Sequence, residues 1–92
     1  MELIVRIKEQ QALRYEDFTG RDDQPQRIAK MGFVLLHGAS TIYAEACGDY
    51  ATRIAQLDPN YYYLADISVR CNQTRDGSRY FNDIRLNAIN VL

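Results

Sequence analysis

The chain has 92 residues, of which 47% are hydrophobic and 25% are charged, with 11 Lys and Arg against 12 Asp and Glu. A chain of this length holds one hydrophobic core, so we expect a single domain over residues 1–92. This composition excludes a disordered, collagen-like or disulfide-dense chain. The formal net charge of -1 excludes a histone-like binder of nucleic acid but leaves a local basic groove open, because binding depends on where charges lie.

The N-terminal residues and the cysteines bear on the cellular compartment. No stretch approaches the roughly 20 apolar residues that span a bilayer, and residues 1–6 become charged too early for a signal peptide. We therefore expect a cytoplasmic protein with no membrane partner. Cys47 and Cys71 lack a CxxC neighbour and His37 is the only histidine, so we expect reduced thiols, no metal site and no cofactor.

The N-terminal segment predicts one strand and then a loop. Leu3, Val5 and Ile7 alternate with residues of the opposite face, which is the period-two pattern of a strand. Residues 9–26 are polar and rich in turn formers. They predict a long loop, with room for a short helical turn over residues 10–18.

The middle of the chain predicts a hairpin followed by a short helix. Apolar runs cover residues 27–37 and 41–46, and the three residues between them are typical of a hairpin. Apolar residues then recur at helical spacing over residues 49–57, which predicts a helix of about two turns. Asp49 is its expected N-cap, and Pro59 stops it.

The C-terminal third predicts two more strands. Residues 61–71 alternate between two faces, and residues 72–78 form a polar turn with the Asp-Gly signal of a hairpin. Residues 80–92 then form the last strand. Its apolar residues change face near Ala88, which a β-bulge would explain.

The predicted order is strand, long loop, strand, strand, short helix, strand, turn, strand. Five strands with one helix between the third and the fourth are the arrangement of the OB-fold, a Greek-key barrel that commonly binds oligonucleotides and oligosaccharides. Five strands in a chain this short bury a core only if the sheet closes. We therefore expect an all-β, five-stranded OB-fold barrel with one short helix between strands 3 and 4.

Several short segments of the chain carry motifs of a known family. They are ACGDYA at residues 46–51, YLADISVR at 63–70, RDG at 75–77 and YFNDIR at 80–85, with ALRY at 12–15 in the first loop. Together they resemble the bacterial single-stranded DNA-binding proteins, and the chain is also similar to the small dimeric primosomal OB-fold proteins. The resemblance implies an OB-fold and the binding of single-stranded DNA in DNA replication.

The resemblance also indicates where bases would stack. In that family, bases stack on aromatic side chains, and each stack contributes about 1–3 kcal/mol. The corresponding positions here fall near Thr41, Cys47 and Asn72, none of which is aromatic. Nucleic-acid binding is therefore expected to be weaker and more salt-sensitive than in the family.

An OB-fold binds its ligand on the exposed face of its second and third strands, between the first loop and the last hairpin. Arginine suits such a face because it pairs with phosphates and stacks on bases. The candidate nucleic-acid-binding residues are Arg14, Tyr15, Arg21, Arg27, Lys30, Tyr43, Arg70, Arg75, Arg79 and Tyr80. Alternatively, Arg75 and Arg79 are solvated hairpin charges and Tyr43 packs across strands.

The run of three tyrosines at residues 61–63 has three open interpretations. Alternation sends Tyr62 to one side of a strand and its neighbours to the other, so at least one ring lies near the surface. The rings could form a stacking platform, fill the end of the barrel or form a subunit interface.

The sequence contains no Gly-rich phosphate loop and no interpretable pairing of nucleophile and base, so we expect a protein that is not an enzyme. One hypothesis is the binding of single-stranded nucleic acid, DNA rather than RNA, through arginines and tyrosines. The other is a protein-interaction or oligomerisation OB module that binds no nucleic acid. Both predict a homodimer or higher homo-oligomer, because Ile4, Val34, Leu36 and Leu64 lie on faces that one core does not cover.

Overall fold

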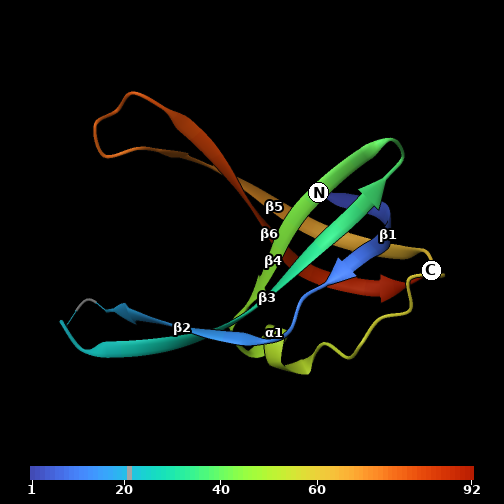
Figure 1. Ribbon diagram of the computed structural model, residues 1–92, viewed down its shortest axis with the longest axis horizontal. Helices are drawn as coiled ribbons and strands as arrows, with labels where there is room; N and C mark the ends of the chain where they lie inside the picture. The colour runs from blue at the N-terminus through green and yellow to red at the C-terminus, as the bar shows by residue number, and fades with distance from the viewer. Residues whose placement is uncertain (21) are drawn as a thin grey trace.

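The computed structural model describes residues 1–20 and 22–92. Six strands dominate these residues, and together they form one sheet (Figure 1). The elements are, in chain order, β1 (Glu2–Gln10), β2 (Arg14–Thr19), β3 (Pro25–His37), β4 (Ser40–Cys47), α1 (Gly48–Arg53), β5 (Tyr63–Gln73) and β6 (Tyr80–Val91). All five predicted strands end within two residues of their predicted termini, and the strand predicted over residues 61–71 is shifted as a whole by two residues.

The strand pairings run in a ring. β1 pairs antiparallel with both β3 and β5, β3 pairs with β4, and β5 pairs with β6. A parallel bridge between Glu45 of β4 and Arg85 of β6 completes the ring. β2 lies outside the ring and pairs only with the first part of β3. The fold is therefore all-β and barrel-like, which confirms the predicted class.

Alternating side chains of the ring strands fill its interior. The largest fully buried side chains are Val5 of β1, Phe33 and Leu35 of β3, and Leu86 of β6. Val5 shows the strand period of two most clearly, because it is fully buried while both of its neighbours in β1 are exposed. Burying a side chain of this size contributes roughly 1.5–3 kcal/mol, so these side chains, which come from three different strands, hold the ring together.

β6 contains the predicted β-bulge. The register of the β5–β6 pair shifts between Asp66 and Ile67, and the extra residue in β6 is Asn87. The bulge allows Leu86 and Ile89, three positions apart, both to be buried in the core.

The prediction of a long loop over residues 9–26, with a possible helical turn over 10–18, is wrong. β2 pairs with β3 from Arg14 opposite Lys30 to Thr19 opposite Pro25. The sequence did not predict this hairpin, because most side chains of β2 are exposed and its residues show no alternation of apolar and polar side chains.

α1 is shorter than predicted and begins differently. Its N-cap is Cys47, and the expected cap, Asp49, lies in the first turn. Gln10 binds the segment after the helix, donating to the Ala55 carbonyl at 3.0 Å and accepting from the Leu57 N–H at 2.8 Å. α1 is the one helix in residues 1–20 and 22–92, and it is too short and polar to cross a membrane.

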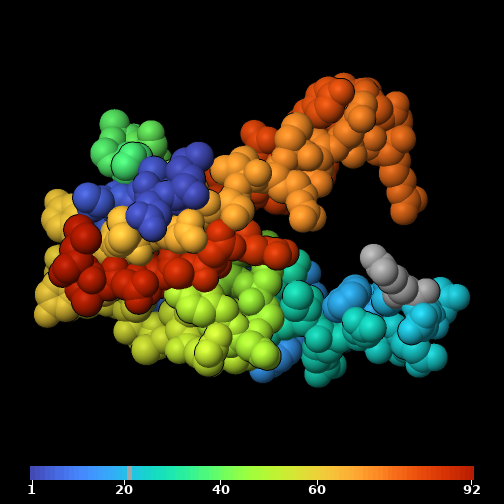
Figure 2. All heavy atoms as spheres, turned by 180° about the vertical axis from the view of Figure 1, so that it is seen from behind, coloured from blue at the N-terminus to red at the C-terminus, as the bar shows by residue number. Residues whose placement is uncertain are grey.

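Two hairpins extend from the same side of the ring (Figure 1). We call residues 14–30, which comprise β2 and the start of β3, the first arm. We call residues 68–85, which comprise the far ends of β5 and β6 and the turn between them, the second arm. Figure 2 shows the two arms projecting side by side with open space between their tips.

Candidate nucleic-acid interface

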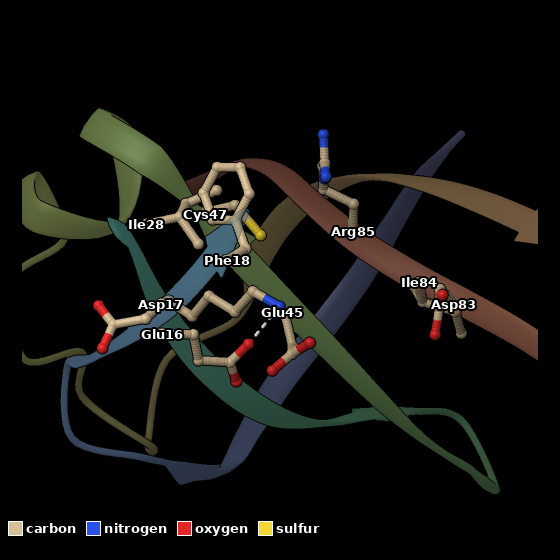
Figure 3. A pocket seen from close by; sticks show the side chains of 10 residues that line it. Glu16, Asp17, Phe18, Ile28, Glu45, Cys47, Asp83, Ile84 and Arg85 are labelled. Carbon is tan, nitrogen blue, oxygen red and sulfur yellow. Dashed lines mark ion pairs between the residues drawn. The ribbon is translucent and has the colours of Figure 1, made fainter. Parts of the chain in front are cut away.

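A groove with a cavity of about 370 Å³ lies between the bases of the two arms. Phe18 and Ile28 of the first arm form its apolar wall together with Cys47 of β4, and Figure 3 shows these three side chains gathered on one side. The charged residues that line it are Glu16, Asp17, Lys30, Glu45, Asp83 and Arg85. The groove therefore combines an apolar surface with more acidic than basic groups.

Ion pairs join the charged side chains on the β2–β3–β4 side of this groove. Lys30 Nζ lies 2.9 Å from Glu16 Oε2, and Arg14 pairs with Glu16 at 3.3 Å and also with Glu45. The hydrogen bond from Lys30 lowers the pKa of Glu16, and the same contact raises the pKa of Lys30. Both cations are thus neutralised by carboxylates on their own face of the sheet.

Tyr43 lies against this network because of a glycine on the adjacent strand. The Tyr43 hydroxyl lies 3.3 Å from both Glu45 Oε2 and Gln11 Oε1 and can donate its one hydrogen to either of them. Tyr43 Oη and Gln11 Oε1 occupy the space that a Cβ at Gly32 would need. Burial, followed by the charge of Glu45, raises the pKa of Tyr43. Tyr43 therefore takes part in the hydrogen bonding of this face, and about half of its side chain is exposed to solvent.

The other described basic residue of the first arm is also paired. Arg27 Nε lies 3.1 Å from Asp17 Oδ1, and its guanidinium carbon lies 6.0 Å from the centre of the Tyr15 ring. By register, Tyr15 and Arg27 share the side of the arm opposite to that of Lys30. The predicted site residue Arg21 lies outside the described residues.

The second arm differs, because its arginines have no acidic partner among the described residues. Arg70, Arg75, Arg79 and Arg85 form no ion pair within 4.0 Å with any residue in the described part of the chain. Their side chains are exposed, so the guanidinium groups meet water. These groups are free to bind an anionic ligand.

Asp76 instead organises the turn at the tip of the second arm. Its Oδ1 accepts hydrogen bonds from the Thr74 hydroxyl at 2.6 Å, the Ser78 N–H at 3.0 Å and the Ser78 hydroxyl at 2.8 Å. These bonds, led by the one from Thr74, lower the pKa of Asp76 to about 2. Gly77 adopts a φ of +74°, which glycine tolerates best, as the predicted Asp-Gly turn requires.

The register of the second arm separates its two aromatic rings. Tyr80 and Ile84 share the side that continues the core face, whereas Phe81 shares the other side with Arg85 and, across the strand pair, Arg70. Tyr80 is 71% exposed and Phe81 is 50% exposed. The arm thus offers an aromatic side chain to the solvent on each of its faces.

The predicted site residues therefore fall into three groups. Arg14, Lys30 and Tyr43 are brought together on the β2–β3–β4 face, and Tyr15 and Arg27 lie on the far side of the first arm. Arg75 and Arg79 occupy the tip of the second arm, and Arg70 and Tyr80 lie on its opposite sides.

Sequence reasoning missed three side chains of this region as site residues, namely Phe18, Phe81 and Arg85. The spacing of four between Phe81 and Arg85 could have placed them on one face of the last strand. Phe18 had no such signal, because its strand was not recognised.

Two further predictions concern the cysteines and a metal site. Cys47 is a half-buried free thiol and Cys71 an exposed one. Among residues 1–20 and 22–92, no three His, Cys, Asp or Glu side chains gather as they would to hold a metal ion.

The three tyrosines at residues 61–63 have separate environments. Tyr63 is buried in the core, and its hydroxyl donates to the Asp58 carbonyl at 3.1 Å. Tyr62 lies beneath Arg6, whose guanidinium carbon is 5.6 Å from the ring centre. β5 begins at Tyr63, so Tyr61 precedes the strand that it was predicted to open. Of the three interpretations, filling the end of the ring describes Tyr63.

Comparisons with protein-family models, with curated proteins and with solved structures found no match to this chain. The resemblance to the bacterial single-stranded DNA-binding proteins therefore stays a prediction from the sequence.

Proposed function

We propose that the fold is an OB-fold with an extended first connection. The ring strands in chain order are β1, β3, β4, β5 and β6, and α1 lies between the third and the fourth of them. β2 then belongs to the connection between the first two ring strands, which in OB-folds flanks the ligand-binding face. The second arm corresponds to the other flanking connection.

We infer that the groove and the second arm bind single-stranded nucleic acid, DNA in preference to RNA, without catalysing a reaction. The observation that carries this proposal is the set of four arginines without ion pairs in the described residues, next to the exposed rings of Tyr80 and Phe81. Free guanidinium groups bind phosphates, and each stacked base contributes about 1–3 kcal/mol.

The first arm has the weaker role in this proposal. A phosphate that approached Arg14 or Lys30 would have to compete with Glu45 or Glu16 for the cation. Binding would then depend on a few arginines of one arm and would weaken steeply with salt.

The test is a fluorescence-anisotropy titration with labelled oligothymidine at low and physiological salt. We expect Arg75→Ala with Arg79→Ala to weaken binding about tenfold or more, and to reduce the slope of log affinity against log salt by about one per arginine. The matched control, Lys8→Ala with Arg53→Ala, removes the same charge from exposed positions that do not line the groove. Absence of binding by the unaltered protein at low salt would refute the proposal, and an oligouridine titration compares RNA with DNA.

A second candidate function, self-association without nucleic acid, is favoured by one apolar position. Ile4 is 51% exposed on the outer side of β1 and lies opposite Leu64 of β5, which is itself half-buried. Val34 and Leu36 are also only half-buried. If this face forms a homodimer, light scattering will give twice the chain mass, and Ile4→Glu will return it to a monomer.

A further inference from the structure

The second arm has a second cavity, on the side that carries Phe81. It measures about 220 Å³ and is lined by Ser68, Arg70, Asp83, Arg85 and Asn87. By register these residues lie on the face opposite to the one that continues the core. We call it the outer cavity. The function proposed above for the groove between the arms gives this cavity no role.

The two arginines of the outer cavity come from different strands. Arg70 lies opposite Asp83, and Arg85 lies opposite Ser68, so the two arginines occupy diagonal positions across the β5–β6 pair, and both line the cavity. Asp83 does not pair with either of them within 4.0 Å in the described residues, and its Oδ2 accepts a hydrogen bond from Asn72 Nδ2 at 2.8 Å. Two unpaired cations therefore share one small cavity.

Neutral donors complete the lining. The extra residue of the β-bulge, Asn87, donates from Nδ2 to Ser68 Oγ at 2.7 Å. The Ser68 oxygen is thus an acceptor in this pair, and its hydroxyl hydrogen can point to a ligand. The bulge brings Asn87 to the cavity, because it shifts this part of β6 by one residue relative to β5.

We propose that the outer cavity binds one phosphate group, held by Arg70 and Arg85 and by the Ser68 hydroxyl. Two guanidinium groups facing one carboxylate leave a positive charge, and arginine matches the geometry of phosphate oxygens. The groove between the arms has the opposite balance, with four carboxylates against Lys30 and Arg85, so a phosphate is disfavoured there.

The source of the phosphate group is either a nucleic-acid strand or free phosphate. Asp83 and Arg85 line both the groove and the outer cavity, so the two sites adjoin across β6. A strand with bases in the groove could therefore place a backbone phosphate in the outer cavity. This assignment to a strand rests on the proposed function, whereas the phosphate site itself does not.

The first experiment follows backbone amide shifts by NMR as inorganic phosphate is added at constant ionic strength against sodium chloride. We expect saturable shifts centred on Ser68 and Asn87, which Arg70→Ala removes and Arg53→Ala retains. Because Arg70 and Arg53 are both exposed, we expect both variants to fold, and their amide spectra check this. Shifts spread evenly over the surface, or unchanged in Arg70→Ala, would overturn the phosphate site.

The second experiment repeats the oligothymidine titration with three variants. Arg70→Ala and Arg85→Ala should each weaken binding about three- to tenfold and lower the salt slope by about one. Asp83→Asn removes a carboxylate from the outer cavity and preserves an acceptor for Asn72, so it should tighten binding about twofold.

The two experiments separate the possible failures. If oligothymidine binds but Arg70→Ala and Arg85→Ala weaken binding no more than the control Lys8→Ala with Arg53→Ala, the strand is not the source of the phosphate, and the assignment to a strand fails while the proposed function stands. If no oligothymidine binds, the proposed function fails, and the inorganic phosphate titration alone decides whether the outer cavity is a phosphate site.

Discussion

The two arms have similar shapes and the same number of basic residues, yet they present different chemistry. The first arm, residues 14–30, has four basic and four acidic residues, and the second arm, residues 68–85, has four arginines and two aspartates. In the first arm, each described cation pairs with a carboxylate. In the second arm, the arginines have no such partner among the described residues.

The two arms differ in ion pairing because their carboxylates accept hydrogen bonds from different kinds of donor. Glu16 and Asp17 of the first arm accept from Lys30 and Arg27, so acid and base neutralise each other. Asp76 of the second arm accepts from hydroxyl and amide groups, and Asp83 accepts from a side-chain amide. Because these donors are neutral, the carboxylates are satisfied without using the arginines. The number of basic residues therefore says less about anion binding than the partners of the acidic ones do.

The largest effect that we expect from this difference concerns the exposed tyrosines. Tyr80→Ala should cost oligothymidine binding about 1–3 kcal/mol, because no cation of the described residues covers its ring and it lies on the arm that carries the arginines without ion pairs. Tyr15→Ala should have little effect, because Arg27 already covers that ring. Both variants are measured by fluorescence anisotropy, and Tyr80→Phe is the control that keeps a stacking surface. Equal losses for Tyr80→Ala and Tyr15→Ala would mean that the arms contribute equally.

We expect a smaller change in oligothymidine binding when cations of the first arm are released from their ion pairs, as in the second arm. Glu16→Gln with Glu45→Gln removes the carboxylates that neutralise Lys30 and Arg14. We expect oligothymidine to bind about tenfold more tightly at low salt, with a salt slope about one to two units steeper, because two cations become available.

The control for this change is Glu2→Gln with Glu9→Gln, which raises the net charge equally from exposed positions of β1. If both double variants tighten binding to the same extent, the gain comes from overall charge, and pairing in the first arm does not limit binding.

Alternation and turn signals predicted most of the fold. The period of two identified β1 and β5, apolar runs identified β3 and β4, and the change of face near Ala88 predicted the bulge that β6 has at Asn87. These elements were predictable because each buries one face. β2 buries neither face fully, so nothing in its residues distinguished a strand from a loop. The residues after α1 are hydrogen-bonded to Gln10, which is 45 residues away in the chain from Ala55 and which no local pattern connects to them.

The candidate site was predictable in residue type but not in pairing. The sequence indicated Arg14 and Lys30 as candidate phosphate-binding residues, and the structure brings them together on the β2–β3–β4 face. Their neutralisation by Glu45 and Glu16 depends on the register of three strands, which the sequence pattern alone does not specify. For Arg75 and Arg79, the alternative of solvated hairpin charges stays open until binding is measured.

The smallest expected effect is in the titration of the carboxylates of the two arms. Carboxyl carbon shifts measured by NMR should give Asp76 a midpoint near pH 2, below its ordinary 3.8, because neutral donors stabilise the charged form. The sign follows: the hydrogen bonds of Asp76 support the turn fully above the ordinary pKa, and this support is lost as pH falls through about 2. Thr74→Val removes the strongest of these bonds and should raise the midpoint towards 3.8.

The same NMR titration, repeated at higher salt, should affect the carboxylates of the two arms differently. The pKa of Glu16 is lowered chiefly by Lys30, a full charge at an exposed site, so added salt should raise it towards the ordinary value. The pKa of Asp76 is lowered by uncharged hydroxyl and amide donors, so salt should change it much less. A midpoint for Asp76 that moves with salt as much as that of Glu16 would show that charge, and not neutral hydrogen bonding, holds the tip of the second arm. The arginines there would then not be free.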